Sequence, residues 1–177
     1  MKALLFSVIG VLTAITICFG FSCYYSYFYP LEYTEIIETN ANNYGVEPEL
    51  IASVINVESS YNKYSLSSKG AMGLMQILPS TAEWVCNRLG KDDEINLYEP
   101  SVNIQIGTYY ISYLINYFGD EELAICAYNA GMGNVKRWLS TVEYSSDGVK
   151  LDAVPFKETE NYLKQVQKNK TIYKNKF

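Results

Sequence analysis

The first feature of the chain is a long run of apolar residues at its N-terminus. From Ala3 to Cys23 no residue is charged, and the run reaches the roughly 20 predominantly apolar residues that a membrane-spanning helix needs. Aromatic residues follow at once: Tyr24, Tyr25, Tyr27, Phe28 and Tyr29. Aromatic rings gather where a span meets the water interface. The pattern predicts one N-terminal transmembrane helix over residues 3–23, within an anchor and juxtamembrane segment that ends at residue 31.

Two other interpretations of this segment remain open. A cleaved signal peptide has an apolar core of only about 7 to 15 residues and a small-residue exit, and neither is clear here. A lipoprotein signal would need an aliphatic residue at the start of Gly20–Cys23, and the sequence lacks one. An uncleaved anchor is therefore favoured.

The charges that flank the run predict its orientation. Lys2 precedes the run and the next basic residue is Lys63, whereas Glu32, Glu35 and Glu38 follow the run closely. Basic residues favour the cytoplasmic side of a span. The sequence thus predicts a single-pass protein of the cell membrane, with a cytoplasmic N-terminus and the body on the extracytoplasmic face.

Beyond Pro30 the apolar positions recur with helical spacing. Helices are expected after Pro30 up to a break at 42–45, from near Pro48 through Glu58, and over 79–89, 101–118, 121–129, 134–139 and 158–168. Nothing in the body is typical of a strand. We expect one compact all-α domain over residues 32–168, followed by a frayed basic tail over residues 169–177.

Charge and composition narrow the function. The 177 residues carry 14 basic and 19 acidic side chains, a net charge of -5, which argues against a nucleic-acid partner. The chain has no histidine, which removes Ser-His-Asp and Cys-His nucleophiles and most zinc sites. Acid–base chemistry must therefore use carboxylates, Tyr or Lys.

The four cysteines predict no metal site. Cys18, Cys23, Cys86 and Cys126 contain no Cys-x-x-Cys pair. Cys86 and Cys126 could be bridged in an extracytoplasmic body, although two well-separated cysteines are more often buried thiols. The sequence gives no reason to expect a metal or a cofactor.

Glu58 is the candidate acid. It lies four and seven positions after Val54 and Ile51, so its side chain shares the apolar side of their helix. Burial disfavours the ionised form of a carboxyl group and raises its pKa, as a general acid at neutral pH requires. The alternative is a helix-end glutamate that is only solvated or capping.

Two later segments suit the wall of a sugar-binding groove. Residues 67–76 bring Gly70, Gly73 and the amide of Gln76 next to apolar residues, and residues 127–131 place small residues around Tyr128 and Asn129. Glycines let a ligand approach the backbone, and an amide both donates and accepts hydrogen bonds. An ordinary glycine-rich turn is the alternative for the first segment.

Taken in order, these segments resemble the successive motifs of the soluble lytic transglycosylase (SLT) family of glycoside hydrolases, family 23. The motifs are Glu58-Ser59, Gly70-Ala71-Met72-Gly73-Leu74-Met75-Gln76 and Ala127-Tyr128-Asn129-Ala130-Gly131. The segments 79–82, 103–107 and 155–162 are also similar to that family. The resemblance covers roughly residues 35–166, which is nearly the whole body.

The resemblance implies a lysozyme-like (goose-type or SLT) all-α fold, with Glu58 as the single catalytic acid. Ser59 would orient the sugar, and Gln76 with the backbone of Met75 would line the groove near the acetamido groups. The remaining pocket residues that the resemblance implies are Tyr128, Asn129 and Tyr162. The chain departs from the family at Glu160, where the family often has Arg, and this changes the local charge.

The activity implied is peptidoglycan lytic transglycosylation, in which the bond between N-acetylmuramic acid and N-acetylglucosamine is cut and a 1,6-anhydro ring closes, without metal or cofactor. A hydrolytic muramidase would instead need a second carboxylate to activate water, and Asp92, Asp93 and Asp120 lie outside the motifs. A non-catalytic glycan-binding or assembly protein is the third reading. The expected partners are peptidoglycan glycan strands and the cytoplasmic membrane through residues 3–23; the sequence names no cell-wall or secretion complex.

Overall fold

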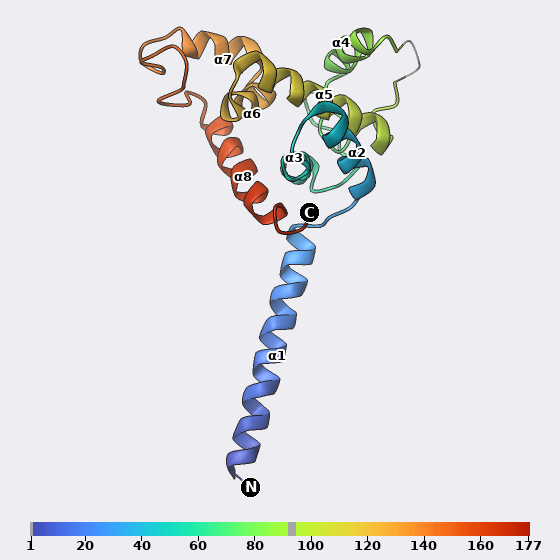
Figure 1. Cartoon of the computed structure of the whole chain (residues 1–177), viewed down its shortest axis with the longest axis vertical. Coiled ribbons are helices and arrows are strands. Elements are labelled where there is room, and N and C mark those ends of the chain that lie inside the picture. The colour runs from blue at the N-terminus through green and yellow to red at the C-terminus, as the bar shows by residue number, and fades with distance from the viewer. Residues whose placement is uncertain (1, 92–94) are drawn as a thin grey trace.

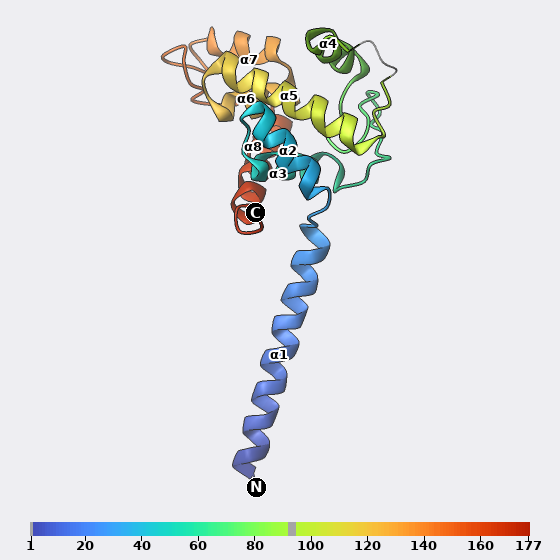
Figure 2. The same ribbon diagram turned by 45° about the vertical axis from the view of Figure 1, so that its right-hand side comes forward.

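The computed structural model describes residues 2–91 and 95–177, and the side chains of 2–11 and 21–22 lie outside this description. Helix α1 (Lys2–Phe28) projects from a compact body as a single rod (Figures 1 and 2). Among the described residues, no helix is both long enough and apolar enough to cross a membrane. The span expected over residues 3–23 includes side chains at 3–11 and 21–22 that lie outside the described residues.

The other regular elements of the described chain are helices, so the expected all-α fold is confirmed. The helices are α2 (Thr34–Tyr44), α3 (Pro48–Ser59), α4 (Pro79–Leu89), α5 (Pro100–Phe118), α6 (Glu121–Ala130), α7 (Met132–Leu139) and α8 (Lys157–Tyr173). Proline opens α3, α4 and α5, where its missing N–H is not needed. Outside the helices, the described residues form only isolated bridges around Met72.

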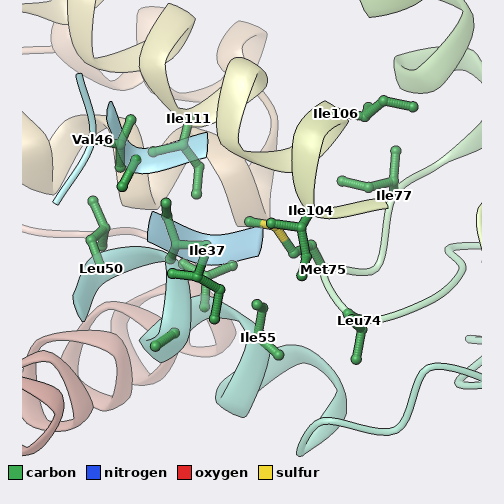
Figure 3. Close-up of a cluster of buried hydrophobic side chains, with 14 of the residues drawn as sticks. Ile37, Val46, Leu50, Ile55, Leu74, Met75, Ile77, Ile104, Ile106 and Ile111 are labelled. Atoms are coloured by element: carbon green, nitrogen blue, oxygen red, sulfur yellow. The ribbon is translucent and has the colours of Figure 1, made fainter. Parts of the chain in front are cut away.

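The core lies where α2, α3 and α5 meet the loop between α3 and α4 (Figure 3). Ile37, Ile55, Leu74 and Ile104 are all fully buried there. A second cluster joins the end of α5 to α6 and α7 and includes the buried Trp138. Apolar burial of this kind is the main favourable contribution to folding.

The loop over residues 65–77 is fixed by one buried amide. The Asn103 side chain accepts a hydrogen bond from the Met75 N–H at 2.8 Å and donates to the carbonyls of Met72 (2.9 Å) and Leu97 (2.8 Å). Gly73 has a φ of 77°, and a Cβ there would overlap the Leu97 carbonyl and the Asn103 amide. These contacts therefore fix the backbone conformation of the loop.

The expected frayed tail over residues 169–177 is wrong. Helix α8 continues to Tyr173, whose side chain is fully buried and donates to the Pro30 carbonyl at 2.8 Å. Lys176 donates to the Tyr29 carbonyl. The lysine-rich composition suggested a solvated segment, but the buried side chain of Tyr173 makes this segment part of the domain.

Gly73 and Gly70 offer a matched test of this loop. Both have positive φ, 77° and 82°, but a Cβ at Gly70 would meet nothing within 4 Å. Gly70→Ala should therefore cost only the backbone strain of about 1–2 kcal/mol. Gly73→Ala should cost a further ~1–3 kcal/mol from the steric overlap.

Urea unfolding of the two variants measures the difference. Equal losses of unfolding free energy in the two would show that the close packing around Gly73 does not constrain the loop.

Candidate active site

Glu58 is held half-buried at the C-terminal end of α3, beside α8. The hydroxyl of Tyr162, from α8, donates a hydrogen bond to Glu58 Oε1 at 2.7 Å. Tyr162 is itself buried. The two residues are far apart in sequence, so the packing of α8 on α3 creates this contact.

The pKa of Glu58 is raised from its ordinary value to about 7. Desolvation by the surrounding side chains is the largest cause, and the negative charge of Glu158 adds to it; the hydrogen bond from Tyr162 acts in the opposite sense. A carboxyl group with this pKa is partly protonated at neutral pH, which agrees with the acid predicted from the apolar helix face.

Three adjoining hollows form a groove that begins at Glu58. The first is lined by Glu58, Tyr162, Glu158 and Asn129, among others. Asn129 also lines the second hollow, together with Gln76 and Tyr128. The third shares Thr81 and Tyr110 with the second and ends at Trp84, Tyr113 and Met132. Residues from α3, α4, α5, α6, α7 and α8 thus meet along one track.

Gln76 and Asn129 present complementary amide groups to this groove. The Gln76 amide nitrogen donates to the carbonyls of Ser65 (3.2 Å) and Gly73 (2.9 Å), which leaves its oxygen as the acceptor. The Asn129 oxygen accepts from the Thr159 hydroxyl at 2.8 Å, which leaves its NH₂ as the donor. An acetamido group has one N–H and one C=O, so this pair matches it.

Tyr128 links the groove to the loop that Asn103 fixes. Its hydroxyl donates to the Met75 carbonyl at 2.8 Å, while the Met75 N–H is bonded to Asn103. Both backbone groups of Met75 are thus used inside the protein, and its side chain is fully buried. Burial, with the nearby charge of Glu58, holds the pKa of Tyr128 well above its usual value, so its phenol stays neutral.

Ser59 occupies a supporting position. Its hydroxyl donates to the Leu74 carbonyl at 2.8 Å and lies 3.1 Å from the Ile55 carbonyl. This contact ties the end of α3 to the loop on the other side of the groove. Its predicted role in orienting a sugar stays a prediction.

The sequence did not single out Glu158, which lies four positions before Tyr162 and lines the same hollow as Glu58. That spacing places Glu158 and Tyr162 on the same side of α8. From this spacing alone, the sequence could have indicated that Glu158 lies near the site. Glu160 does not face this hollow; it pairs with Lys157 at 2.7 Å and with Lys164 along the helix. The charge change expected from Glu160 is thus balanced by those lysines.

The other carboxylates lie elsewhere. Asp120 caps α6 by accepting from the Leu123 N–H at 2.9 Å, and Asp92 and Asp93 lie outside the described residues. Within the described part of the chain no group of three or more potential metal ligands is present, and no disulfide joins Cys86 to Cys126 there.

Known proteins have sequences similar to that of this chain. Residues 35–148 match the family described as the transglycosylase SLT domain. A soluble lytic murein transglycosylase from Salmonella typhimurium is 34% identical over 143 residues, covering 78% of this chain and 22% of that protein. Membrane-bound lytic murein transglycosylase C from Actinobacillus pleuropneumoniae is 34% identical over 166 residues, covering 80% of this chain and 46% of that protein.

Solved structures share the fold. The lytic transglycosylase Slt of Pseudomonas aeruginosa, solved as an inactive mutant, superposes with a TM-score of 0.73 at 30% identity, over 84% of this chain and 25% of that one. The 70 kDa soluble lytic transglycosylase of Escherichia coli also gives 0.73, at 29% identity. The chain spans between a fifth and a half of the length of these sequence relatives. The helical body therefore has the lysozyme-like SLT fold, and the chain belongs to the SLT transglycosylase family.

Proposed function

We propose that the chain is a peptidoglycan lytic transglycosylase that uses Glu58 as its only acid and base. The observation that carries the proposal is a half-buried carboxyl group with a pKa near neutrality, at the end of a groove with an amide donor and an amide acceptor. The family relatives are named for this activity, which supports the same chemistry here.

The reaction follows from the position of one proton. Protonated Glu58 donates to the oxygen that links N-acetylmuramic acid to N-acetylglucosamine, and that bond breaks. The acetamido group of the muramic acid stabilises the cation. The side chains of Gln76 and Asn129 orient this acetamido group. Ionised Glu58, now stabilised by the Tyr162 hydroxyl, takes the proton from the 6-hydroxyl as the 1,6-anhydro ring closes. Glu58 is protonated again at the end of the cycle, as it was at the start, and no water is consumed.

A hydrolytic muramidase is the second candidate, because one observation favours it. Glu158 is an exposed carboxylate that lines the hollow of Glu58, and a second carboxylate is what a water-activating route needs. Asp120 is less suited, since capping α6 occupies it. A non-catalytic glycan-binding role would retain the groove without the reaction.

We also propose that residues 3–23 anchor the enzyme in the cell membrane as a single span, with the body on the extracytoplasmic face. The uncharged stretch and the exposed rings of Tyr24, Tyr25, Tyr27 and Phe28 support this. The body would then act on glycan strands close to the membrane.

Glu58→Gln should separate catalysis from binding. Loss of the proton should lower kcat by about 100- to 10,000-fold, while the Kd for glycan chains stays essentially unchanged. Mass spectrometry of the sugars released from purified peptidoglycan identifies the chemistry, with Glu83→Gln on the exposed side of α4 as the matched control.

Anhydro products from the wild type alone support the transglycosylase. Reducing-end products heavier by one water, lost in Glu158→Gln, would assign the hydrolase instead. Products that persist in Glu58→Gln would remove Glu58 from the reaction.

The pH dependence tests the environment of Glu58. Because the protonated form is the reactive one, kcat/KM should fall by about tenfold per pH unit above the Glu58 pKa of about 7. Tyr162→Phe removes a bond that lowers this pKa, so the alkaline limb should move to higher pH. Glu158→Gln removes a charge that raises the pKa, so the limb should move to lower pH.

Glu83→Gln should leave the limb in place. Shifts of the same sign in Tyr162→Phe and Glu158→Gln would contradict the assignment of the limb to Glu58.

The anchor can be tested in the full chain. Leu12→Arg with Ile15→Arg puts two charges inside the proposed span, each costing about 2.5–3.5 kcal/mol there. We expect the wild type to resist alkaline extraction from membranes and the Arg variant to be released, whereas the matched change Leu12→Ile with Ile15→Leu has no effect. Equal retention of all three proteins would refute an anchor in this segment.

A further inference from the structure

An aromatic track follows the groove away from Glu58. Successive ring centroids along it lie 5.7 Å (Tyr128–Tyr110), 6.0 Å (Tyr110–Trp84), 4.8 Å (Trp84–Tyr113) and 6.2 Å (Tyr113–Tyr117) apart. Trp84 and Tyr113 are half-buried and line the last hollow. Flat apolar ring faces suit the faces of sugar rings, so this track extends the surface on which a glycan can lie.

Two cations lie over rings at the far end of the track. Arg88 lies one turn after Trp84 on α4, and its guanidinium carbon is 4.4 Å from the Trp84 ring and 5.0 Å from the Tyr113 ring. Lys136 lies one turn after Met132 on α7, and its nitrogen is 5.6 Å from the Tyr117 ring. Helix α5 supplies the rings between them, so α4 and α7 form two walls that each end in a positive charge.

Arg88 and Lys136 are exposed, and neither forms an ion pair within residues 2–91 and 95–177. The opposite end of the groove carries the carboxyl groups of Glu58 and Glu158. In a chain of net charge -5, the groove is thus acidic where the reaction occurs and basic where it ends.

We propose that Arg88 and Lys136 form a site for the carboxylates of the peptide substituents that glycan strands carry on their muramic acid, so that the enzyme selects strands with peptides over bare glycan. The proposal rests on the proposed function and adds a substrate preference to it. A guanidinium group packed against the Trp84 and Tyr113 rings keeps a forked set of N–H donors that can bind a carboxylate through two hydrogen bonds. The aromatic rings position the sugar, and the two cations bind the carboxylates of its peptide substituent.

The test compares full-length proteins on two substrates. Peptidoglycan with its peptides is set beside the same material stripped to bare glycan by an amidase. Arg88→Met with Lys136→Met should lower kcat/KM about tenfold on the first substrate, mainly through KM, and leave the second unchanged. Arg88→Lys with Lys136→Arg keeps the charges but removes the forked guanidinium at position 88, so it should retain part of the preference and lie between the wild type and the Met pair.

A matched control is available. Lys63 also lies over a tyrosine ring, that of Tyr64 at 5.0 Å, outside the groove, and Arg137 is the neighbour of Lys136 bonded to Asn134. Lys63→Met with Arg137→Met removes the same types of charge and should change nothing on either substrate. Calorimetric binding of a peptide-bearing glycan fragment in the Glu58→Gln background gives a second readout that needs no catalysis, and its Kd should rise about tenfold in the Met pair.

The outcomes separate the two proposals. If the wild type releases no anhydro products from either substrate, the proposed function fails. If it does release them, but the Met pair loses activity equally on both substrates or on neither, the carboxylate site is refuted. Removal of phosphate-containing polymers by acid, with peptides kept, should leave the preference intact; loss of the preference at that step would assign the anion to phosphate and overturn the proposal.

Discussion

The packing of α8 against α3 is the contact on which the site depends. Two side-chain hydrogen bonds cross this interface, from Tyr162 to Glu58 and from Asn169 to Asn56, each at 2.7 Å. Both join residues more than a hundred positions apart. Helix α8 therefore supplies part of the surroundings that desolvate Glu58. Burying Glu58 near a second carboxylate disfavours its ionised form and raises its pKa from 4.5 to about 7, so the stability of the fold should fall as the pH rises between these two values.

The opposite wall depends on Asn103. A buried polar group without partners costs about 1–3 kcal/mol, and here one amide satisfies the Met75 N–H and two carbonyls at once. Met75 in turn accepts from Tyr128, and its sulfur packs so closely on Gly107 that a Cβ there would overlap it. The groove wall is thus connected to α5 by hydrogen bonds and by direct packing, and its geometry does not rely on the loop alone.

Much of this could be predicted from the sequence, for identifiable reasons. The helical periodicity of the apolar positions predicted most helix boundaries within a few residues, and proline does stand at the start of α3, α4 and α5. The apolar face of α3 predicted the raised pKa of Glu58. The end of the chain could not be predicted, because residues 169–177 contain three lysines, and Tyr173 is buried only through contacts with distant parts of the chain, among them the Pro30 carbonyl and the Tyr29 and Tyr61 rings. Glu158 was missed because its charge acts across the gap between two helices.

The end of α1 is held by the same two helices that make the site. The carbonyls of Phe28, Tyr29 and Pro30 accept from Asn56, Lys176 and Tyr173. Asn56 belongs to α3, Tyr173 is the last residue of α8, and Lys176 lies in the turn that follows it. A junction bonded at three successive carbonyls is not a loose linker, so the body has a set direction relative to α1. Helices α4 and α7 lie at the end of the body away from α1 (Figures 1 and 2). If α1 stands in the membrane, the two helices that carry Arg88 and Lys136 then lie at the end of the body away from the lipid.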